Sequence, residues 1–207
     1  MRSEAFLYVL RKVRDMSQLP LFPLSNPLFP GQTLPLQIFE PRYLSLVSRC
    51  MKEDSTFGVV QIREGREVGQ PPLIFQFGVE AKIVDFTQRD NGLLGISVLG
   101  QRKFSVLSTT ISDEQLMMAE VSWLEDEILA PIPDRFDGLV DILEQLLQHP
   151  AVSVFKLSPA TNSRDLGWQL CQLLPLSPPD KVALLSLDDP ELRLEHLAER
   201  IARMSAE

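Results

Sequence analysis

The alternation of apolar and polar residues gives way to a helical period within one short stretch of the chain. Residues 33–38 alternate between apolar and polar or proline positions, which is the pattern of a half-buried β-strand. The apolar residues of this strand are Leu34, Leu36 and Ile38. Beyond residue 40 the apolar residues recur at helical spacing, and this stripe consists of Tyr43, Leu44, Leu46, Val47, Cys50 and Met51. The pattern predicts a strand followed directly by a helix.

Prolines mark the corners of this joint. Pro30-Gly31 is a turn signal before the strand. Pro41 suits the first position of the helix, where its missing N–H is not needed. Glu40 stands at the N-terminus of the helix, where the helix dipole favours a negative charge. We interpret the run LFPGQTLPLQIFEPRY (28–43) as an architectural joint between a sheet and a helix.

Further strands are predicted on both sides of the joint. Residues 19–24 are apolar but contain two prolines, which cannot donate to a sheet ladder, so they form an edge strand or an extended crossing segment. Apolar or alternating runs predict strands over 57–62, 75–83, 96–106 and 116–124. Asp90-Asn91-Gly92 predicts a tight turn, and Gly100 predicts a bulge or bend. Together these segments predict an antiparallel, barrel-like β unit that carries one helix.

The pattern changes after residue 127. Apolar residues then recur at helical spacing over 136–147, 166–174, 182–185 and 194–201. Signals for helix starts or ends stand beside these stripes, at His149-Pro150, Thr161, Asn162, Ser163, Ser177-Pro178, Asp188 and Asp189. No strand pattern interrupts them, so a small helical bundle is predicted. The fold class is therefore α+β, with a β-rich part at 16–127 and a helical part at 128–207.

Residues 1–15 admit two interpretations. Phe6, Val9, Leu10 and Val13 fall at helical spacing, which predicts an amphipathic helix. Met16 is a second candidate for the start of the protein, which would make residues 1–15 a translated upstream extension. The segment has an acidic residue ahead of a short apolar stretch and no small-residue cleavage site, so it is a poor secretory signal.

Composition disfavours several classes of partner and ligand. The 207 residues carry a net charge of -8 at pH 7, which disfavours nucleic acid as a partner. No apolar run approaches the roughly 20 residues of a membrane-spanning helix, so we expect no membrane partner and a cytoplasmic location. Cys50 and Cys171 stand far apart in apolar surroundings, and we expect two reduced core thiols. No Cys/His grouping indicates a metal, and no cofactor is expected.

The sequence contains no recognisable catalytic motif. A phosphate-binding GxxxxGK[ST] loop and a GxSxG nucleophile motif are both absent. His149 and His196 are predicted to lie at a helix end and on a solvated helix face. The acidic run 125–127 lacks partner ligands at metal spacing, and we interpret it as a solvated linker face. We therefore predict no catalytic residue, no metal site and no enzyme activity for this chain.

The run LFPGQTLPLQIFEPRY (28–43) resembles the opening signature of the substrate-binding N-terminal domain family of Lon proteases, in particular its small stand-alone bacterial members. Weaker matches follow in the same order: FGVVQIREG (57–65), FGVEAKIVDF (77–86), DNGLLGISVLGQRKFSV (90–106) and LCQLLPLSPPDKVALLSLDDPELRLEHL (170–197). The resemblance covers most of residues 18 to 205. It implies a PUA-like β pseudo-barrel with one inserted helix, followed by a helical bundle. It also implies a domain that engages exposed, often unfolded segments of client proteins. The ATPase and peptidase modules of Lon proteases do not fit within this chain.

We predict a non-catalytic polypeptide-binding module. Its expected partners are unfolded or exposed polypeptide segments, and a protease or a chaperone is a further candidate partner. Such binding needs exposed apolar surface or a free strand edge, and segments 19–24 and 28–35 are the candidate edges. The candidate binding residues are Phe22, Phe29, Glu40 and Arg42.

The two phenylalanines stand beside prolines and are predicted to be partly exposed, so that replacing both with serine leaves the stability nearly unchanged. The charged pair either frames this surface or forms an internal ion pair. The alternative function is an RNA-binding PUA-like module or a small enzyme that uses the cleft between the two parts.

Overall fold

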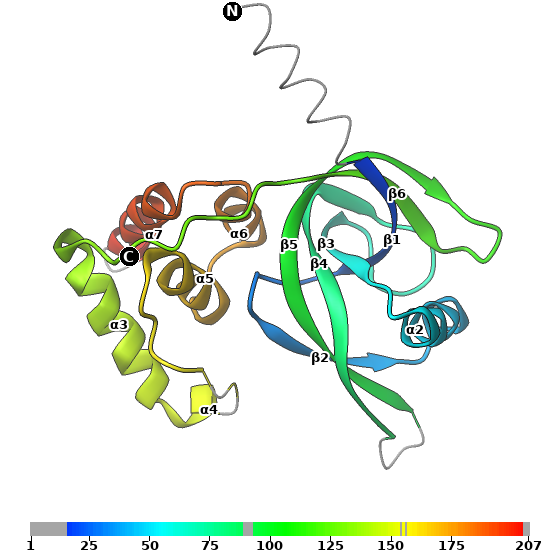
Figure 1. The fold of residues 1–207 in the computed structure, drawn as a ribbon, viewed down its shortest axis with the longest axis horizontal. Helices are drawn as coiled ribbons and strands as arrows, with labels where there is room; N and C mark the ends of the chain where they lie inside the picture. Colours follow the sequence, from blue (N-terminus) through cyan, green and yellow to red (C-terminus); the bar gives the residue numbers. More distant parts are fainter. Residues whose placement is uncertain (1–15, 89–92, 154, 156, 205–207) are drawn as a thin grey trace, which may run out of the picture.

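The computed structural model describes residues 16–88, 93–153, 155 and 157–204. The predictions for residues 1–15 and for the turn at 90–92 lie outside these residues. A run of strands with one helix is followed by a run of helices, as predicted (Figure 1). The strand-rich elements are β1 (Met16–Leu24), β2 (Thr33–Ile38), α2 (Pro41–Glu53), β3 (Phe57–Glu64), β4 (Leu73–Gln88), β5 (Leu94–Ile111) and β6 (Met117–Trp123). The helical elements are η1 (Asp134–Phe136), α3 (Asp137–Gln148), α4 (Pro150–Ser153), α5 (Ser163–Leu173), α6 (Pro178–Leu185) and α7 (Pro190–Met204).

The strands form one sheet that closes on itself. Their order is β2-β5-β4-β3-β1-β6, and β6 also pairs with β5, so all strands except β2 form a ring. The long β5 allows this because residues 94–99 pair with β2 and residues 104–111 pair with β6. The pairs are antiparallel except β1–β3, which is parallel. A parallel pair needs a long crossover, and the segment 25–56, with β2 and α2, provides it.

The predicted joint between strand and helix is confirmed. β2 buries Leu36 and Ile38, and Pro41 begins α2 in the first turn. The buried stripe of α2 is narrower than the periodicity predicts, because Leu44 and Met51 are exposed. The apolar pattern thus located the helix correctly and overestimated its buried face.

Segment 19–24 is the crossing segment of the two predicted alternatives. Residues 16–20 of β1 pair with β6, and residues 21–24 pair with β3. Each half of the strand has one neighbouring strand, so some of its main-chain positions face no partner. Proline, which has no N–H to donate, is tolerated at such positions. The apolar side chains of this segment are buried, so they offer no exposed apolar surface to a client. The edge strand of the described sheet is β2, which overlaps the other predicted segment, 28–35.

The helix signals of the C-terminal part are also confirmed. Asn162 and Ser177 cap α5 and α6, each accepting a hydrogen bond from a main-chain N–H three residues on. Asp189 Oδ1 accepts a hydrogen bond from the N–H of Glu191 at the start of α7. These helices share one hydrophobic core with the strands: Phe57 and Val79 belong to the same buried cluster as Leu170 and Leu194. Cys50 and Cys171 are free and buried, as expected.

The chain crosses itself closely at Gly100 of β5. Main-chain hydrogen bonds join the N–H of Gly31 to the Gly100 oxygen and the N–H of Gly100 to the Gln32 oxygen, each at 2.9 Å. A Cβ atom at position 100 would lie 2.2 Å from the main-chain oxygen of Phe29. A glycine is therefore required at position 100 because the turn before β2 approaches the main chain of β5 so closely. The register of β4 against β5 shifts next to this residue.

Gly100→Ala is expected to lower the free energy of unfolding by about 1–3 kcal/mol, the usual cost of overpacking, because the methyl group meets main chain that cannot rotate away. Gly138→Ala is the matched control: Gly138 lies in α3, and a methyl group added there would meet no neighbouring atom within 4 Å. There the same change should raise stability by up to about 1 kcal/mol through helix propensity. Urea unfolding followed by circular dichroism measures both, and equal stabilities would contradict the close crossing.

Candidate functional site

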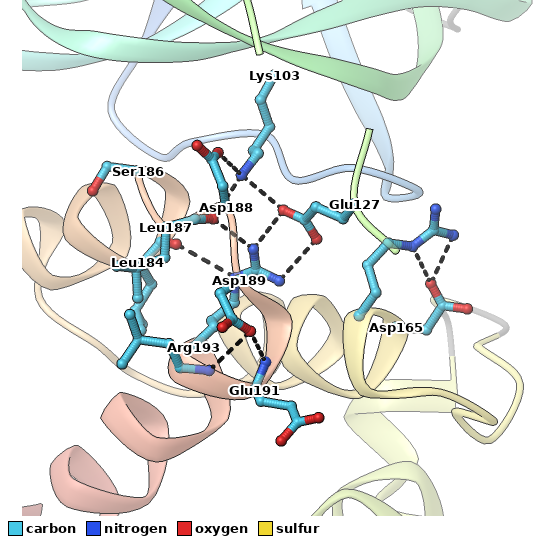
Figure 2. Close-up of polar contacts among 12 residues, drawn as sticks. Lys103, Glu127, Asp165, Leu184, Ser186, Leu187, Asp188, Asp189, Glu191 and Arg193 are labelled. Atoms are coloured by element: carbon cyan, nitrogen blue, oxygen red, sulfur yellow. Dashed lines mark hydrogen bonds and ion pairs between the residues drawn. The ribbon is translucent and has the colours of Figure 1, made fainter. Parts of the chain in front are cut away.

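A buried cluster of charges joins the strand ring to the helices (Figure 2). Glu127, from the segment that follows β6, lies between Lys103 of β5 and Arg193 of α7. Its Oε1 atom is 2.7 Å from Lys103 Nζ and 2.5 Å from Arg193 Nη2. The side chains of Lys103, Glu127 and Arg193 are 3%, 4% and 0% exposed. A buried carboxylate of this kind is stable only because both cations compensate it.

The remaining donors of the two cations also have partners. Arg193 Nη1 donates to the second Glu127 oxygen at 3.0 Å, and Nη2 donates to the Leu187 oxygen at 2.7 Å. Lys103 Nζ donates to the same Leu187 oxygen at 2.6 Å and to Asp188 at 3.0 Å. The Arg193 guanidinium carbon lies 3.4 Å from the centroid of the Trp168 ring. The cluster therefore fixes α7, the loop before it and α5 against β5.

The interpretation of the acidic run 125–127 as a solvated face is wrong for Glu127. The sequence pattern treats the run as uniform, but the chain turns inward at its third residue, where two cations from distant elements meet it. A signal was present in α7: Arg193 stands four residues before Leu197, on the face that carries the buried leucines. A charged residue on an apolar helix face indicates a buried partner.

A cleft of about 370 Å³ opens beside this cluster. One wall is the crossing turn and the start of β2, and the other is one face of α5 together with residues from the segment between α4 and α5. The lining residues are Pro30, Gly31, Gln32, Thr33, Phe155, Leu157, Ser158, Arg164, Asp165, Trp168, Gln169 and Gln172. The α5 residues recur at intervals of four, which places them on one face of the helix. The cleft thus lies between the strand ring and the helices.

Two polar atoms in the lining residues lack a hydrogen-bond partner. Trp168 Nε1 and Gln169 Oε1 are both buried and unpaired. The Gln169 amide nitrogen does have a partner, because it donates to the Ser158 oxygen at 3.0 Å. Most buried polar atoms in folded proteins are hydrogen-bonded, so these two atoms are exceptions within the fold.

The prediction that Phe22 and Phe29 are partly exposed is wrong. Phe22 is 7% exposed and stacks on Tyr43 with a 4.0 Å separation of ring centroids. Phe29 is 1% exposed and stacks on Trp168 at 5.7 Å. Neighbouring prolines suggested a surface loop, but the turn folds back over β5 and presses Phe29 onto α5. Phe39 is the exposed phenylalanine of the joint.

Glu40 and Arg42 form the internal ion pair that was one of the two predicted alternatives. Arg42 Nη2 lies 2.8 Å from Glu40 Oε2, and Arg42 Nη1 donates to the Gln115 oxygen at 3.2 Å. The arginine thus ties the start of α2 to the loop between β5 and β6. Burial raises the pKa of the neighbouring Tyr43 to about 12, although the arginine opposes this shift. These contacts stabilise the start of α2 within the strand-to-helix joint.

A larger cavity of about 870 Å³ lies on another part of the ring, between α2, β1 and the loop that joins β5 to β6. Its charged lining is mostly acidic: Arg49 faces Glu53, Asp54, Glu80, Asp113 and Glu114. Glu80 is engaged by Thr56 at 2.8 Å and by Arg102 at 3.3 Å. Excess negative charge makes this cavity unfavourable for phosphate groups.

The described residues contain no arrangement that indicates catalysis or metal binding. No group of three or more His, Cys, Asp or Glu side chains among them is placed to hold a metal ion. His149 Nδ1 accepts a hydrogen bond from the N–H of Ala151, and His196 is 3.9 Å from Glu199 on an exposed helix face. Within the described part of the chain, no helix is both long and apolar enough to cross a membrane. Cytoplasmic location stays a prediction.

Glu127→Gln is expected to lower the free energy of unfolding by about 3–5 kcal/mol, because it leaves two cations buried without a counter-charge. Asp126→Asn removes the same charge from the adjacent, exposed residue and should change stability by less than about 0.5 kcal/mol. Guanidinium unfolding of the two variants tests the pair. A small change in the free energy of unfolding for Glu127→Gln would mean that the charge cluster does not hold the helices against the strand ring.

Phe29→Ser is expected to cost about 3–5 kcal/mol, the usual loss for truncating a buried phenylalanine. Phe39→Ser, in the same proline-rich joint, should leave the melting temperature nearly unchanged because the ring is exposed. Thermal unfolding measures both variants. A stable Phe29→Ser protein would restore the surface role that the sequence suggested.

Comparison with known proteins assigns this architecture to a family. The family model for the ATP-dependent protease La (LON) substrate-binding domain matches residues 18–203. A Lon protease of Cytophaga hutchinsonii is 33% identical over 146 residues, which are 69% of this chain and 17% of that protein. Protein cereblon of Gallus gallus is 31% identical over 105 residues, which are 49% of this chain and 22% of that protein. The chain therefore spans about a fifth of the length of these relatives.

Solved structures show the same fold. The Lon N-terminal domain protein from Xanthomonas campestris has a TM-score of 0.75 and 35% identity, over 88% of this chain and 98% of that one. The N-terminal domain of a Mycobacterium avium complex Lon protease has a TM-score of 0.62 at 18% identity, over 88% and 97%. The α+β fold is thus the predicted PUA-like one, and the similarity is to the substrate-binding domain rather than to protease or ATPase modules. This chain belongs to the family of Lon substrate-binding domains.

Proposed function

We propose that this chain binds segments of other polypeptides, without converting them chemically, in the cleft between the strand ring and the helices. The observation that carries the proposal is the composition of that cleft, which combines apolar side chains with amide and hydroxyl side chains. Phe155, which is 44% exposed, stands with Leu157 beside the polar face of α5. Apolar surface next to a few convergent polar groups is the usual make-up of a binding cleft.

The edge of the sheet supports the same proposal. β2 pairs with β5 alone in the described sheet, and Thr33 at its start lines the cleft. An extended client segment that enters the cleft therefore runs toward a strand with one unpaired side. Addition of a strand to such an edge is a general mode of polypeptide recognition. The family to which the chain belongs, named for substrate binding, favours a polypeptide client as well.

The charges near the cleft support a binding role without catalysis. Glu127, the carboxylate of the buried cluster, is held by two cations and does not line the cleft. Arg164 lines the cleft but pairs with Asp165 at 3.0 Å. The cleft thus offers little net positive charge to a phosphate backbone, and the net charge of -8 opposes one further. A polypeptide client fits this surface better than RNA.

Phe155→Ser is expected to weaken binding of an unfolded polypeptide about tenfold, because it removes an exposed aromatic contact worth about 1.4 kcal/mol. The probe is fluorescently labelled, reduced and carboxymethylated α-lactalbumin, and fluorescence anisotropy gives its Kd. Phe86→Ser is the matched control: Phe86 is 59% exposed on β4, where it pairs with Ile96 of β5, and it does not line the cleft. It should leave the Kd unchanged.

Salt and substrate distinguish the alternatives. Binding that falls steeply as salt is raised, or a preference for single-stranded RNA over the unfolded protein, would favour the RNA-binding alternative. Equal loss in the two phenylalanine variants would place the contact elsewhere on the surface. Absence of any binding by the unmodified chain would refute the proposed function.

A further inference from the structure

We infer that the client binds as an added strand, pairing its main chain with the free edge of β2 between Thr33 and Gln37. The inference rests on the proposed function and specifies how recognition occurs. In the described sheet, β2 is the terminal strand and pairs with β5 alone. One side of its main chain therefore has no neighbouring strand. An extended polypeptide carries donors and acceptors at the spacing of such an edge.

A hydrogen bond at the start of β2 shows which of its residues face outward. The N–H of Gly100 donates to the Gln32 oxygen at 2.9 Å, so these residues form a hydrogen-bonded pair of the antiparallel ladder. The register continues from this pair along β2 without a shift. Hydrogen-bonded pairs alternate with pairs whose main-chain groups point away from each other. The residues of β2 that direct their main-chain groups to the free edge are therefore Thr33, Pro35 and Gln37.

The position of Pro35 agrees with this assignment. Proline has no N–H, and within sheets it occurs where no donor is needed by the ladder. Pro35 lies opposite Ser97 in a pair of the outward-facing kind, so β2 and β5 lose no hydrogen bond. All three outward-facing residues are exposed to solvent. The edge thus offers a client the N–H groups of Thr33 and Gln37 and the main-chain oxygens of all three residues.

The same proline favours a client strand over a second copy of this chain. If the β2 edges of two copies paired with each other, each Pro35 would leave an oxygen of the other strand without a donor. A client without proline leaves only its own oxygen opposite Pro35 unpaired. A proline on an edge strand is a general protection against self-association. The edge is therefore open to other polypeptides and disfavours pairing with itself.

The sheet also predicts which client segments bind best. Residues paired across two strands point their side chains to the same face. On β2, the side chain of Leu36 belongs to the hydrophobic core, and that of Leu34 packs against this core while only partly buried. An apolar client side chain beside Leu34 would remove more apolar surface from water. We therefore expect a preference for extended segments with apolar residues at every second position.

The first test removes an outward-facing donor. Gln37→Pro eliminates the N–H of residue 37 and leaves the ladder to β5 intact, so the melting temperature should change little. It is expected to weaken binding of carboxymethylated α-lactalbumin up to about tenfold, the contribution of one hydrogen bond. Gln37→Ala is the matched control, because it removes the same side chain and keeps the N–H; its Kd should equal that of the wild type. Equal Kd values for the two variants would overturn the inference.

The second test restores the missing donor. Pro35→Ala and Pro35→Thr both supply an outward-facing N–H, and both should tighten binding of the same probe several-fold. Since the two variants differ in their side chains and share the new donor, a main-chain contact predicts the same direction of change in both. Tighter binding in the threonine variant alone would indicate a side-chain contact and contradict the inference, as would an unchanged or weaker Kd in both.

The third test changes the client and leaves the protein unaltered. The tightest-binding short fragment of the probe is compared with versions in which alternate amides are N-methylated, in each of the two registers. Every second N–H of an added strand faces β2, so binding should be lost in one register and kept in the other. Equal binding in both registers refutes the inference. If the wild-type chain binds neither the probe nor its fragments, the proposed function fails and the inference with it; binding that is insensitive to all these changes refutes the inference alone.

Discussion

The charge balance around Glu127 is the constraint on which the rest of the structure depends. One carboxylate compensates a lysine from the strand ring and an arginine from the last helix, and all three side chains are almost completely buried. Buried charges are costly to desolvate, so this arrangement is favourable only when the three elements that bring them together are correctly placed. These contacts therefore form only in this one position of the helices against the ring.

The candidate site follows from that placement. Arg193 covers one face of the Trp168 ring, and Phe29 stacks on the ring from the crossing turn. Gly167 permits the close approach, because a Cβ atom there would lie 3.1 Å from the Arg193 side chain. Gly100 permits the turn to lie against β5 on the other side. The walls of the cleft are thus set by contacts that also stabilise the fold.

The function that this geometry favours needs no reactive group. The buried charges of Lys103, Glu127 and Arg193 pair with one another and do not line the cleft. The lining consists of apolar, amide and hydroxyl groups with one ion pair. Such a lining can hold an extended chain without selecting its charge. The large cavity with a mostly acidic lining lies on another part of the ring. Recognition of many different exposed segments is consistent with both features.

The sequence by itself determined the local structure. Period-2 and helical patterns located β2, α2 and the C-terminal helices, and the capping residues Asn162, Ser177 and Asp189 marked three helix starts, because these features depend on neighbours within a few residues. The strand-to-helix motif also indicated the family. None of this required knowledge of which elements pack together.

Only the tertiary structure decided which side chains are buried and where the cleft lies. Phe29 stands beside prolines in a turn, a pattern typical of the surface, yet α5 covers it from a distant part of the sequence. Glu127 belongs to an acidic run and is buried because Lys103 and Arg193 reach it from distant elements. Trp168 Nε1 and Gln169 Oε1 are buried without a hydrogen-bond partner, which the sequence pattern of α5 does not indicate. Burial and pairing are properties of long-range contacts, and the local pattern of a sequence does not encode which contacts form.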